Sequence, residues 1–366
     1  MSHLSDISVV LPSLDPDEKL TAVIDGLLQY GFTDIILIND GSKPENLHYF
    51  EEAAQHPEVT LLHHEVNRGK GAALKTAFTW FLNNRPDAKG VVTVDGDNQH
   101  HPADTKACAL HMMETGHITL GCRDFNQADV PARSSFGNKT TSAIFKIFVG
   151  MTISDTQTGL RAIPREDLEF IAAIDGDRFE YETNMLLGMK REGIPFDEVK
   201  IRTVYIEENK SSHFHPSRDS WRIYKLILRH FFKYTLSSLT SAVVDTSAYT
   251  LLTVLLRSFL QDFALTAVAG VGARVISSLL NFYMNKRLVF QSSVSTGKAM
   301  LRYYMLAVPQ MAAQVLLTQG VYALLGIPDT ATGLRTLLYA VVMTVLYIVS
   351  FMIQQRWVFA ADKKNK

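Results

Sequence analysis

The stretch Val91–Asp104 reads VVTVDGDNQHHPAD, in which an apolar run leads straight into two aspartates one residue apart. At the end of a strand, side chains at positions i and i+2 share a face, so Asp95 and Asp97 can converge on one point, and Gln99 can reach it as the chain turns away. Oxygen ligands of this kind favour Mg²⁺ or Mn²⁺, ions that keep coordination positions for water and substrate phosphates. The stretch therefore predicts a metal site that holds a nucleotide diphosphate, although an isolated Asp-x-Asp is more often a solvated acidic turn.

Short apolar runs alternate with polar, helix-like segments on both sides of this stretch, up to about Ser217. The runs that we interpret as strands are ISVVLP, DIILIND, VTLLHH, GVVTVDGD and ITLGC, and amphipathic segments such as 69–83 separate them. Such alternation predicts a Rossmann-like α/β domain with a mostly parallel sheet over residues 1–217. Ligands bind at the carboxyl ends of such strands, where both NDGS (Asn39–Ser42) and DGDN (Asp95–Asn98) lie.

The composition limits the partners and the compartment. A chain of 366 residues allows two ordinary domains, and its formal net charge of −1 gives no reason to expect nucleic acid. Cys108 and Cys122 are the only cysteines, too few for a disulfide framework or a zinc ribbon, so we expect packing residues in a reducing compartment. The N-terminus runs directly into a strand-like segment and lacks the features of a cleaved signal peptide.

Apolar residues dominate the chain after Ser217, and four stretches have the length, roughly twenty residues, that a bilayer requires of a helix. We place these spans at 233–256, 263–284, 303–325 and 334–354, in an all-α four-helix transmembrane domain over 233–366. A soluble bundle can hold one such helix, but four in succession favour the membrane.

Lysine and arginine indicate the orientation of these spans. They gather before the first span, between the second and the third and after the fourth, whereas the other side offers only Arg257 and Arg335. The positive-inside rule therefore predicts a multi-pass protein of the cell (plasma) membrane whose α/β domain and both termini are cytoplasmic.

Residues 218–232 form the predicted linker between the two domains. Aromatic residues such as Trp221 and Tyr224 recur there on one helical face, and Arg222 and Lys225 begin a basic stripe, which indicates an amphipathic interfacial helix. The segment SAIFKIFVGM (Ser142–Met151) allows two interpretations, contact with lipid or burial in the α/β domain, and both stay open.

The spans form an internal repeat of two hairpins. NFYMNKRLVF (Asn281–Phe290) closes the second span and SFMIQQRWVF (Ser350–Phe359) closes the fourth, at an offset of 69. Both hairpins also begin with an arginine followed by aromatic residues, in RHFFKY (Arg229–Tyr234) and RYYMLA (Arg302–Ala307). The matched positions predict a parallel rather than an inverted repeat.

Four further motifs accompany DGDN in the α/β part: NDGS, NRGKGAAL (Asn67–Leu74), GCRD and DTQTGLRA. With them the sequence resembles glycosyltransferase family 2 over roughly Ile7 to Trp221, especially the branch that makes polyprenyl-phosphate sugars, such as the dolichyl-phosphate mannose synthases. The resemblance implies a GT-A fold, a UDP- or GDP-sugar donor, Mg²⁺ or Mn²⁺, and inversion at the anomeric carbon of the sugar.

The resemblance also implies roles for single residues. The donor would be bound by Pro12, by Asp40 at the nucleoside base and by Lys70. Asp95 would contact the ribose and the metal, and Asp97 and Gln99 would bind the metal. The acceptor phosphate would be bound by Arg123 and Arg133. The family usually opens with Pro-x-Tyr-Asn-Glu, whereas PSLDPDEKL has Leu14 and Pro16 in place of the Tyr and Glu. The base pocket is therefore altered, and the choice between UDP and GDP remains open.

The chemistry of the acceptor favours a lipid phosphate over a sugar hydroxyl. A phosphate monoester is already ionised and nucleophilic at neutral pH, so its attack on the anomeric carbon needs no strong general base. The reaction needs cations rather than a base, because the departing diphosphate carries negative charge. Lys210, His213 or Arg218, together with the metal, can neutralise that charge. Asp155 and Glu182 are candidates for binding sugar hydroxyls or, with a hydroxyl acceptor, for the general base.

The membrane part, over about Tyr234 to Phe359, resembles the GtrA family of small four-span proteins. That resemblance implies assistance in moving a lipid-linked sugar across the membrane. Asp245, Arg274 and Gln314 each fall near the middle of a predicted span, where charged groups are costly and usually pair. We predict a midplane cluster of these three residues for passage or binding of the lipid-linked sugar. Simple polar contact between helices is the alternative, and for Gln314 alone it is the favoured one.

Two rival functions remain for the whole chain. A processive polysaccharide synthase also joins a family 2 domain to membrane helices, but the Arg356–Trp357 pair lies after the last span with Ile353 where that class has Gln. The second rival function is that of a transporter of lipid-linked sugar, in which the cytoplasmic domain only binds the nucleotide sugar. The intact DGDNQ motif and the arginines make this function less favoured. A homo-oligomer also remains open.

Overall fold

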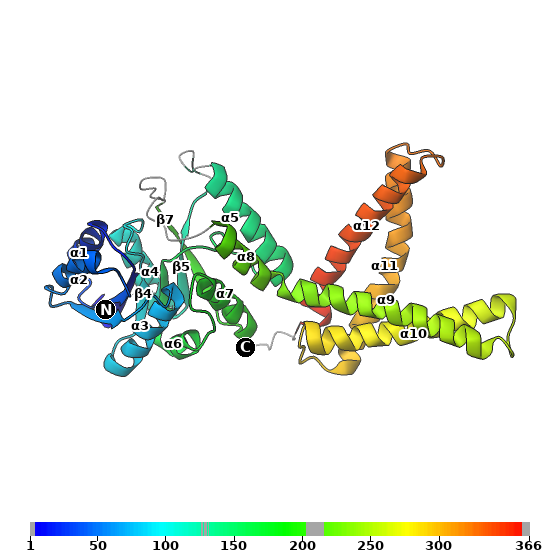
Figure 1. Ribbon diagram of the computed structural model, residues 1–366, viewed down its shortest axis with the longest axis horizontal. Helices are drawn as coiled ribbons and strands as arrows, with labels where there is room; N and C mark the ends of the chain where they lie inside the picture. Colours follow the sequence, from blue (N-terminus) through cyan, green and yellow to red (C-terminus); the bar gives the residue numbers. More distant parts are fainter. Residues whose placement is uncertain (1–3, 126, 128–129, 131, 203–215, 361–366) are drawn as a thin grey trace. The chain divides into compact units, whose positions relative to one another are not determined.

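The computed structural model describes residues 4–125, 127, 130, 132–202 and 216–360 (Figure 1). The chain forms two compact units that divide between Leu226 and Ile227, inside the predicted linker 218–232. Each unit is described by itself below.

The first unit contains one seven-stranded sheet in the order β3-β2-β1-β4-β6-β5-β7. The strands are β1 (Ile7–Ser13), β2 (Ile35–Asp40), β3 (Val59–His64), β4 (Gly90–Thr93), β5 (Ile118–Arg123), β6 (Arg161–Pro164) and β7 (Phe196–Ile201). Every neighbouring pair is parallel except those that β6 makes with β4 and β5. The predicted mostly parallel α/β sheet is thus confirmed, and its parallel strands end at one edge, where β6 begins.

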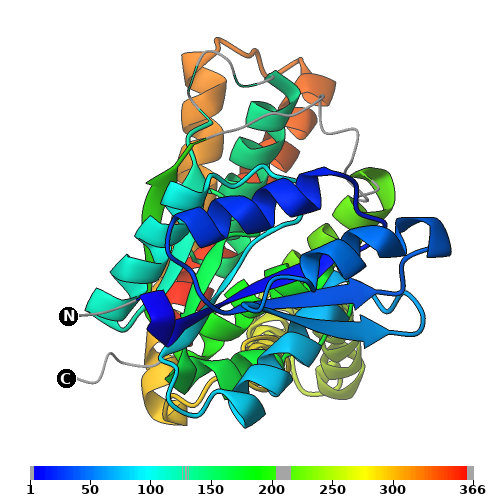
Figure 2. The ribbon, with the colours of Figure 1, turned by 90° about the vertical axis from the view of Figure 1, so that its left-hand side faces the viewer.

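Among the described residues, eight α-helices accompany the sheet. They are α1 (Lys19–Gln29), α2 (Leu47–Ala53), α3 (Lys70–Asn84), α4 (Pro102–Thr115), α5 (Ala132–Ile144), α6 (Arg165–Ala172), α7 (Glu180–Glu192) and α8 (Pro216–Ile227). Helices α1 and α3 lie on opposite faces of the sheet (Figure 2). Covering both faces explains why the central strands are apolar throughout rather than alternating.

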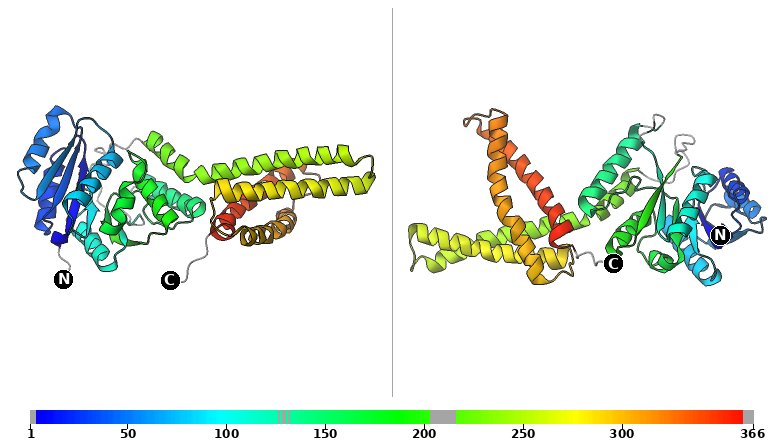
Figure 3. Two further views of the ribbon diagram at one scale, coloured as in Figure 1. Left: turned by 90° about the horizontal axis from the view of Figure 1, so that it is seen from below. Right: turned by 180° about the vertical axis from the view of Figure 1, so that it is seen from behind.

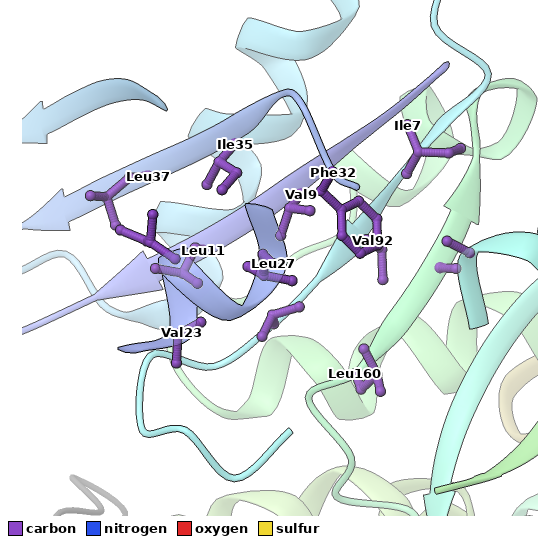
Figure 4. Packing of buried hydrophobic residues seen from close by; sticks show 14 of the residues in the cluster. Ile7, Val9, Leu11, Val23, Leu27, Phe32, Ile35, Leu37, Val92 and Leu160 are labelled. Carbon is purple, nitrogen blue, oxygen red and sulfur yellow. The ribbon is translucent and has the colours of Figure 1, made fainter. Parts of the chain in front are cut away.

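The core on the α1 face follows from the two-residue period of the strands. Alternate residues of β1 and β2, such as Val9, Leu11 and Leu37, pack against Val23 and Leu27 of α1 (Figure 4). Cys108 and Cys122 are both buried, as predicted, and burial raises the pKa of each thiol to about 12. They are packing residues.

The segment Ser142–Met151 continues α5 into the domain interior. A π-helical turn at Phe145–Val149 follows α5, and Phe145 and Met151 are buried while Lys146 is exposed. The segment is therefore partly buried in the α/β domain, while Ile144, Ile147 and Phe148 are only half-buried, and contact of this side with lipid stays a prediction.

The second unit consists of two helical hairpins, α9 (Arg229–Leu256) with α10 (Asp262–Met284) and α11 (Thr296–Leu324) with α12 (Thr332–Ile353). The helices of each hairpin run side by side (Figures 1 and 3). Of the described residues, Arg229–Leu256, Asp262–Val289 and Thr332–Val358 are long and apolar enough to cross a membrane. Helix α11, which contains Pro309, is not among these three, so the predicted count of four spans stays a prediction.

The structure repeats at the offset seen in the sequence. Helices α10 and α12 both end in a five-residue π-helical turn, at Asn285–Val289 and Gln354–Val358, and these turns lie 69 residues apart. The repeat is therefore confirmed, and its offset also makes Tyr234 of α9 the equivalent of Tyr303 of α11.

Equivalent residues of the two hairpins meet at these turns. The Asn285 side chain donates to Gln354 Oε1 over 3.0 Å, and the rings of Phe290 and Phe359 stack with centroids 5.1 Å apart. Further ring pairs are reciprocal, with centroid distances of 5.2 Å for Tyr234–Phe351, 5.5 Å for Tyr303–Phe282, 5.7 Å for Phe290–Phe351 and 5.9 Å for Phe282–Phe359. Each hairpin thus contributes the same residues to a shared, pseudo-symmetric contact.

Candidate functional site

Two carboxylates and one ammonium group meet at the carboxyl edge of the sheet. Asp95 follows β4 by two residues, and its Oδ1 lies 2.7 Å from Nζ of Lys70, the first residue of α3. The same ammonium lies 3.0 Å from Oε1 of Glu182 in the first turn of α7. One strand end and two helix starts thereby bring together charges from distant parts of the chain.

Mutual attraction keeps these groups charged. Burial alone would lower the pKa of Lys70, but Asp95 and Glu182 hold it above its usual range. Burial would likewise raise the pKa of Asp95, but Lys70 and His100, whose Nε2 lies 3.7 Å from Asp95 Oδ2, pull it well below its usual range. Asp95 is therefore an anion and Lys70 a cation at neutral pH.

Asp97 stands in a tight turn beside this cluster. Asn98 adopts a left-handed φ of 59°, and the backbone N–H of Gln99 donates to Asp97 Oδ1 over 3.1 Å. Burial raises the pKa of Asp97 above its usual range, and the neighbouring Asp95 raises it further. Lys70 thus balances Asp95 directly, whereas Asp97 forms no ion pair with the described residues.

This set of donors fits a divalent ion that arrives together with phosphates. Within the described ranges, no three His, Cys, Asp or Glu side chains are grouped to hold a metal by themselves. Mg²⁺ is usually bound by one or two carboxylates with water and substrate phosphates, and Asp95 and Asp97 can supply that number. Gly159 gives the site room, because a Cβ there would collide with the Asp95 carboxylate. A bound ion would also relieve the repulsion that raises the pKa of Asp97.

An arginine and an aspartate form a second pair at the same edge. Arg123, the last residue of β5, places Nε 2.7 Å and Nη2 3.2 Å from the two carboxylate oxygens of Asp155. The Asp155 side chain is fully buried and also accepts the backbone N–H of Gln157 over 3.1 Å. Because both of its oxygens are engaged in this way, Asp155 orients the Arg123 guanidinium, and its predicted catalytic role stays a prediction.

Asp40, at the end of β2, is occupied by the chain itself. Its carboxylate accepts the backbone N–H groups of Arg68, over 3.0 Å, and Gly69, over 2.7 Å, and lies 2.7 Å from Nδ1 of His64. These contacts fix the turn that leads into α3 and so set the position of Lys70. The predicted contact of Asp40 with a nucleoside base would have to replace some of them, because the Asp40 side chain is only 5% exposed.

The loops after β1 and β2 are tied together in the region where the family opening differs. The backbone N–H of Asp15, which has a φ of 47°, donates to Ser42 Oγ over 2.8 Å, and Asp15 Oδ1 accepts the N–H of Lys43 over 2.8 Å. Pro12 lies in β1 opposite Ile38 of β2 and is half-buried. Asp15 thus closes this corner of the site without the Tyr and Glu of the usual motif.

Family models match both units of the chain. Residues 8–171 match glycosyl transferase family 2, and residues 233–359 match the GtrA/DPMS transmembrane domain. The chain joins a family 2 glycosyltransferase domain to a GtrA/DPMS domain. The transferase domain has the GT-A-like fold that the resemblance implied, and the protein is a membrane protein.

Several curated proteins are similar to part of this chain. An uncharacterized protein of Methanocaldococcus jannaschii is 28% identical and covers 62% of this chain and 93% of its own length. The UDP-N-acetylglucosamine–dolichyl-phosphate N-acetylglucosaminyltransferase of Methanococcus voltae is 25% identical over 55% of this chain and 86% of its own. An undecaprenyl-phosphate 4-deoxy-4-formamido-L-arabinose transferase of Yersinia pestis is 27% identical, with coverages of 45% and 51%.

A solved structure also resembles the transferase domain. Glucosyl-3-phosphoglycerate synthase from Mycobacterium tuberculosis, in complex with Mn²⁺, UDP-glucose and phosphoglyceric acid, superposes with a TM-score of 0.46. The sequence identity is 16%, over 61% of this chain and 78% of that one.

Several predicted site residues of the transferase domain lie where no side chain is described. Arg133 is in the first turn of α5 and Arg218 in that of α8, with side chains outside the described set, and Lys210 and His213 lie outside the described residues altogether. Their roles at the acceptor and the diphosphate stay predictions. The structure brings Lys70, Asp95 and Glu182 into contact and places Asp97 and Gln99 in the adjoining turn.

Two residues of the site did not emerge from the sequence. His100 is buried beside Asp95, and its Nδ1 has no partner among the described residues. Arg161, the first residue of β6, is buried and donates to the backbone carbonyls of Thr158, over 3.1 Å, and Glu182, over 2.9 Å. His100 directly follows DGDNQ and Arg161 lies within DTQTGLRA, but a buried polar role is decided by tertiary packing that a motif does not show.

The predicted membrane cluster divides into two separate contacts. Arg274 Nη2 lies 3.2 Å from Asp245 Oδ2, and Ser277 Oγ donates to Asp245 Oδ1 over 2.7 Å, all within the first hairpin. Gln314 instead donates to the hydroxyl of Tyr339 in the second hairpin over 2.9 Å. The prediction of one cluster of three is therefore corrected to an ion pair and a distinct polar contact.

Proposed function

We propose that this protein transfers a sugar from a UDP- or GDP-sugar to a polyprenyl phosphate, of the undecaprenyl type, at the cytoplasmic face of the cell membrane. The observation that carries the proposal is the Asp95 and Asp97 pair at the end of β4, beside the Lys70 ammonium. Such a set suits a diphosphate bound through a divalent ion. The relatives named as dolichyl-phosphate and undecaprenyl-phosphate transferases support a lipid phosphate as acceptor.

The donor would bind over the end of β4. Asp95 and Asp97, with Gln99, would hold Mg²⁺ or Mn²⁺, which supplies positive charge to the diphosphate when it is bound. Lys70 stands 2.7 Å from Asp95 and is placed to contact the donor as well. Glu182, with its backbone held by Arg161, is placed to accept hydroxyl groups of the sugar.

The acceptor would approach Arg123. A phosphate oxygen of the polyprenyl phosphate attacks the anomeric carbon, the bond from that carbon to the diphosphate breaks, and the diphosphate leaves with the electron pair and inversion of configuration. No proton has to be removed from the attacking phosphate. This agrees with the state of Asp155, whose carboxylate is already engaged by Arg123.

Exposed aromatic residues of the transferase domain suit contact with the bilayer surface. Phe136 of α5 is 74% exposed and Trp221 of α8 is 67% exposed, and the two helices are joined by a 3.1 Å hydrogen bond between Thr141 and Tyr224. Lysines on the same helices, such as Lys139, are exposed as well. Aromatic and basic side chains together are typical of surfaces that lie on anionic lipid.

The GtrA/DPMS domain would anchor the enzyme and assist translocation of the lipid-linked sugar. The distribution of lysine and arginine favours cytoplasmic termini and a cytoplasmic transferase domain. A label-transfer assay tests the function as a whole. Full-length protein in detergent is incubated with polyprenyl phosphate, Mn²⁺ and radiolabelled UDP- or GDP-sugars, and we expect one labelled sugar per lipid in the organic phase. Label in a polymer would indicate a processive synthase, and tight binding of donor without transfer would indicate the transporter.

A further inference from the structure

Polar side chains recur along both helices of the first hairpin. On α9 these are Tyr234, Ser237, Ser241 and Asp245, and on α10 and the turn that ends it they are Arg274, Ser277, Asn281 and Asn285. Their spacing of three or four residues keeps each set on one side of its helix. We call these eight residues the polar ladder.

Hydrogen bonds connect the rungs of the polar ladder. Asn285 donates to Asn281 Oδ1 over 2.9 Å, and Asn281 donates to Ser241 Oγ over 3.1 Å. Deeper in the hairpin, Asp245 is bound by Ser277, over 2.7 Å, and by Arg274, over 3.2 Å. The polar ladder therefore holds two hydrogen-bonded groups, one beside the π-helical turn at the end of the span and one around the Asp245–Arg274 pair.

The Asp245–Arg274 pair lies deep in the proposed membrane. At 1.5 Å per residue, Arg274 stands about 18 Å along the helix axis from Asp262, in a hydrocarbon layer about 30 Å thick. Its side chain is nevertheless 71% exposed, whereas that of Asp245 is 23% exposed. Asp245 occupies only part of the guanidinium, and donors that face hydrocarbon without a partner are strongly disfavoured.

The second hairpin does not repeat this arrangement. At the offset of 69, Asp245 corresponds to Gln314, and Arg274 and Ser277 correspond to Met343 and Leu346. Duplication has thus preserved the aromatic contact at the π-helical turns, while only the first hairpin carries an ion pair at these positions. A purely structural role for the pair would not explain why the equivalent hairpin has a neutral amide and two apolar side chains there instead.

We propose that the polar ladder is a binding path for a phosphate carried on a lipid, with the Arg274 guanidinium as its anion-binding group in the middle of the membrane. The inference rests on the proposed function, because the substrate and the product of that function are both lipid-borne phosphates. A lipid can carry its phosphate to this depth while it is translocated, and a guanidinium binds a phosphate with two parallel hydrogen bonds. Asp245, which accepts a hydrogen bond from Ser277, holds one side of the Arg274 guanidinium, and the 71% exposure of the Arg274 side chain leaves room for such a ligand.

The test compares a neutral double variant with a matched control. Asp245→Ala/Arg274→Ala removes both charges and leaves neither unpaired, and Gln314→Ala changes the equivalent position of the second hairpin. Full-length protein in nanodiscs is titrated with polyprenyl-phosphate sugar in one arm and with phosphatidylglycerol in the other, and binding is read by native mass spectrometry. We expect the double variant to bind one of these lipids about tenfold more weakly or worse and Gln314→Ala to bind as the parent does. The arm that responds identifies the source of the phosphate.

Three outcomes would overturn the inference. They are equal binding of both lipids by the double variant and the parent, an equal loss in Gln314→Ala, and efficient disulfide cross-linking of Arg274→Cys between two copies, which would show a second chain covering this position. Arg274→Lys keeps the positive charge but loses the two parallel N–H donors of the guanidinium. If the double variant fails to insert, lipid binding by Arg274→Lys that is intermediate between the parent and no binding would support the proposal. Transfer of label by the parent protein is measured separately. If the parent protein transfers no label, the proposed function is refuted, and lipid binding by Arg274 is then decided by the titration alone.

Discussion

The Lys70 ammonium lies 2.7 Å from the Asp95 carboxylate, so a lysine of this chain neutralises one of the two carboxylates that the proposed metal site requires. A nucleotide diphosphate would bring its own negative charge to this lysine. Metal and donor are then expected to bind together, each lowering the cost of the other, because the ion needs Asp95 and the phosphates need Lys70.

Replacing Lys70 by Met should loosen the protein and strengthen the binding of metal without nucleotide. The variant leaves Asp95 and Glu182 partly buried and uncompensated, which we expect to cost about 3 kcal/mol of stability. Free Mn²⁺ should then bind more tightly than to the parent, as measured by isothermal titration calorimetry. Lys75→Met is the matched control, because Lys75 lies on the same helix and pairs with the exposed Asp177. An unchanged affinity for Mn²⁺ would mean that Lys70 and the ion do not compete for Asp95.

Asp97→Ala should abolish transfer while leaving the protein folded and inserted. Its carboxylate is partly buried next to Asp95, so removing it relieves repulsion and leaves the diphosphate without one of its metal ligands. We expect a loss of about a hundredfold or more in label transfer, comparable to removal of the metal by EDTA. Full activity either in the variant or in EDTA would remove the ion from the mechanism. Asp177→Ala, at the surface, should transfer normally.

Arg133→Ala should raise the apparent KM for polyprenyl phosphate more than that for the nucleotide sugar, because Arg133 is assigned to the acceptor phosphate alone. Arg123→Ala should behave in the same way, and Asp155→Asn should follow it weakly by loosening the guanidinium. Steady-state kinetics with each substrate varied in turn gives the comparison. If Asp155 were instead a general base, Asp155→Asn would remove a limb of the pH–rate profile and leave both KM values unchanged.

The edge of the sheet was predictable, and the contacts across it were not. The strands β1 to β5 appear in the sequence as apolar runs, and the aspartates and arginine that follow them are where the parallel topology places ligands. The four-residue β6 and the half-exposed β7 carry too weak a hydrophobic pattern to be predicted as strands, and the antiparallel pairing of β6 with β4 and β5 has no signal in the sequence. Lys70 was assigned to the donor, but its partner Glu182 comes from α7 and meets it only in the folded domain.

In the membrane domain, too, the sequence predicted the elements but not the contacts between their side chains. The offset of 69 predicted that two hairpins are related, but not that equivalent residues touch each other. Asp245 and Arg274 pair because their helices form one hairpin, whereas Gln314 belongs to the other. Depth in the membrane can be counted along the sequence, but the partner of a side chain depends on which helices pack.

Asn285→Leu should destabilise the membrane domain, and adding Gln354→Leu should restore part of the loss. The single variant leaves the buried Gln354 amide without the Asn285 donor, at a cost of about 1 kcal/mol, whereas the double variant replaces both polar groups. Thermal unfolding in detergent, arranged as a double-mutant cycle, measures the coupling. Additive losses would show that the two side chains do not interact.

The reciprocal contacts at the π-helical turns have the form of an interface between two copies of one hairpin. Asn285 meets Gln354, Phe290 meets Phe359, and the Tyr234–Phe351 contact has its counterpart in Tyr303–Phe282. In a two-fold homodimer, residue i of one chain meets j of the other and j meets i, which is the pattern seen here within a single polypeptide. The two halves of this chain therefore meet across a pseudo-two-fold contact, as two copies of one hairpin would. A single hairpin that ends in this motif is therefore expected to pair with itself, whereas in this chain the two halves differ, with Asp245 and Arg274 in the first and Gln314 and Met343 at the equivalent positions of the second.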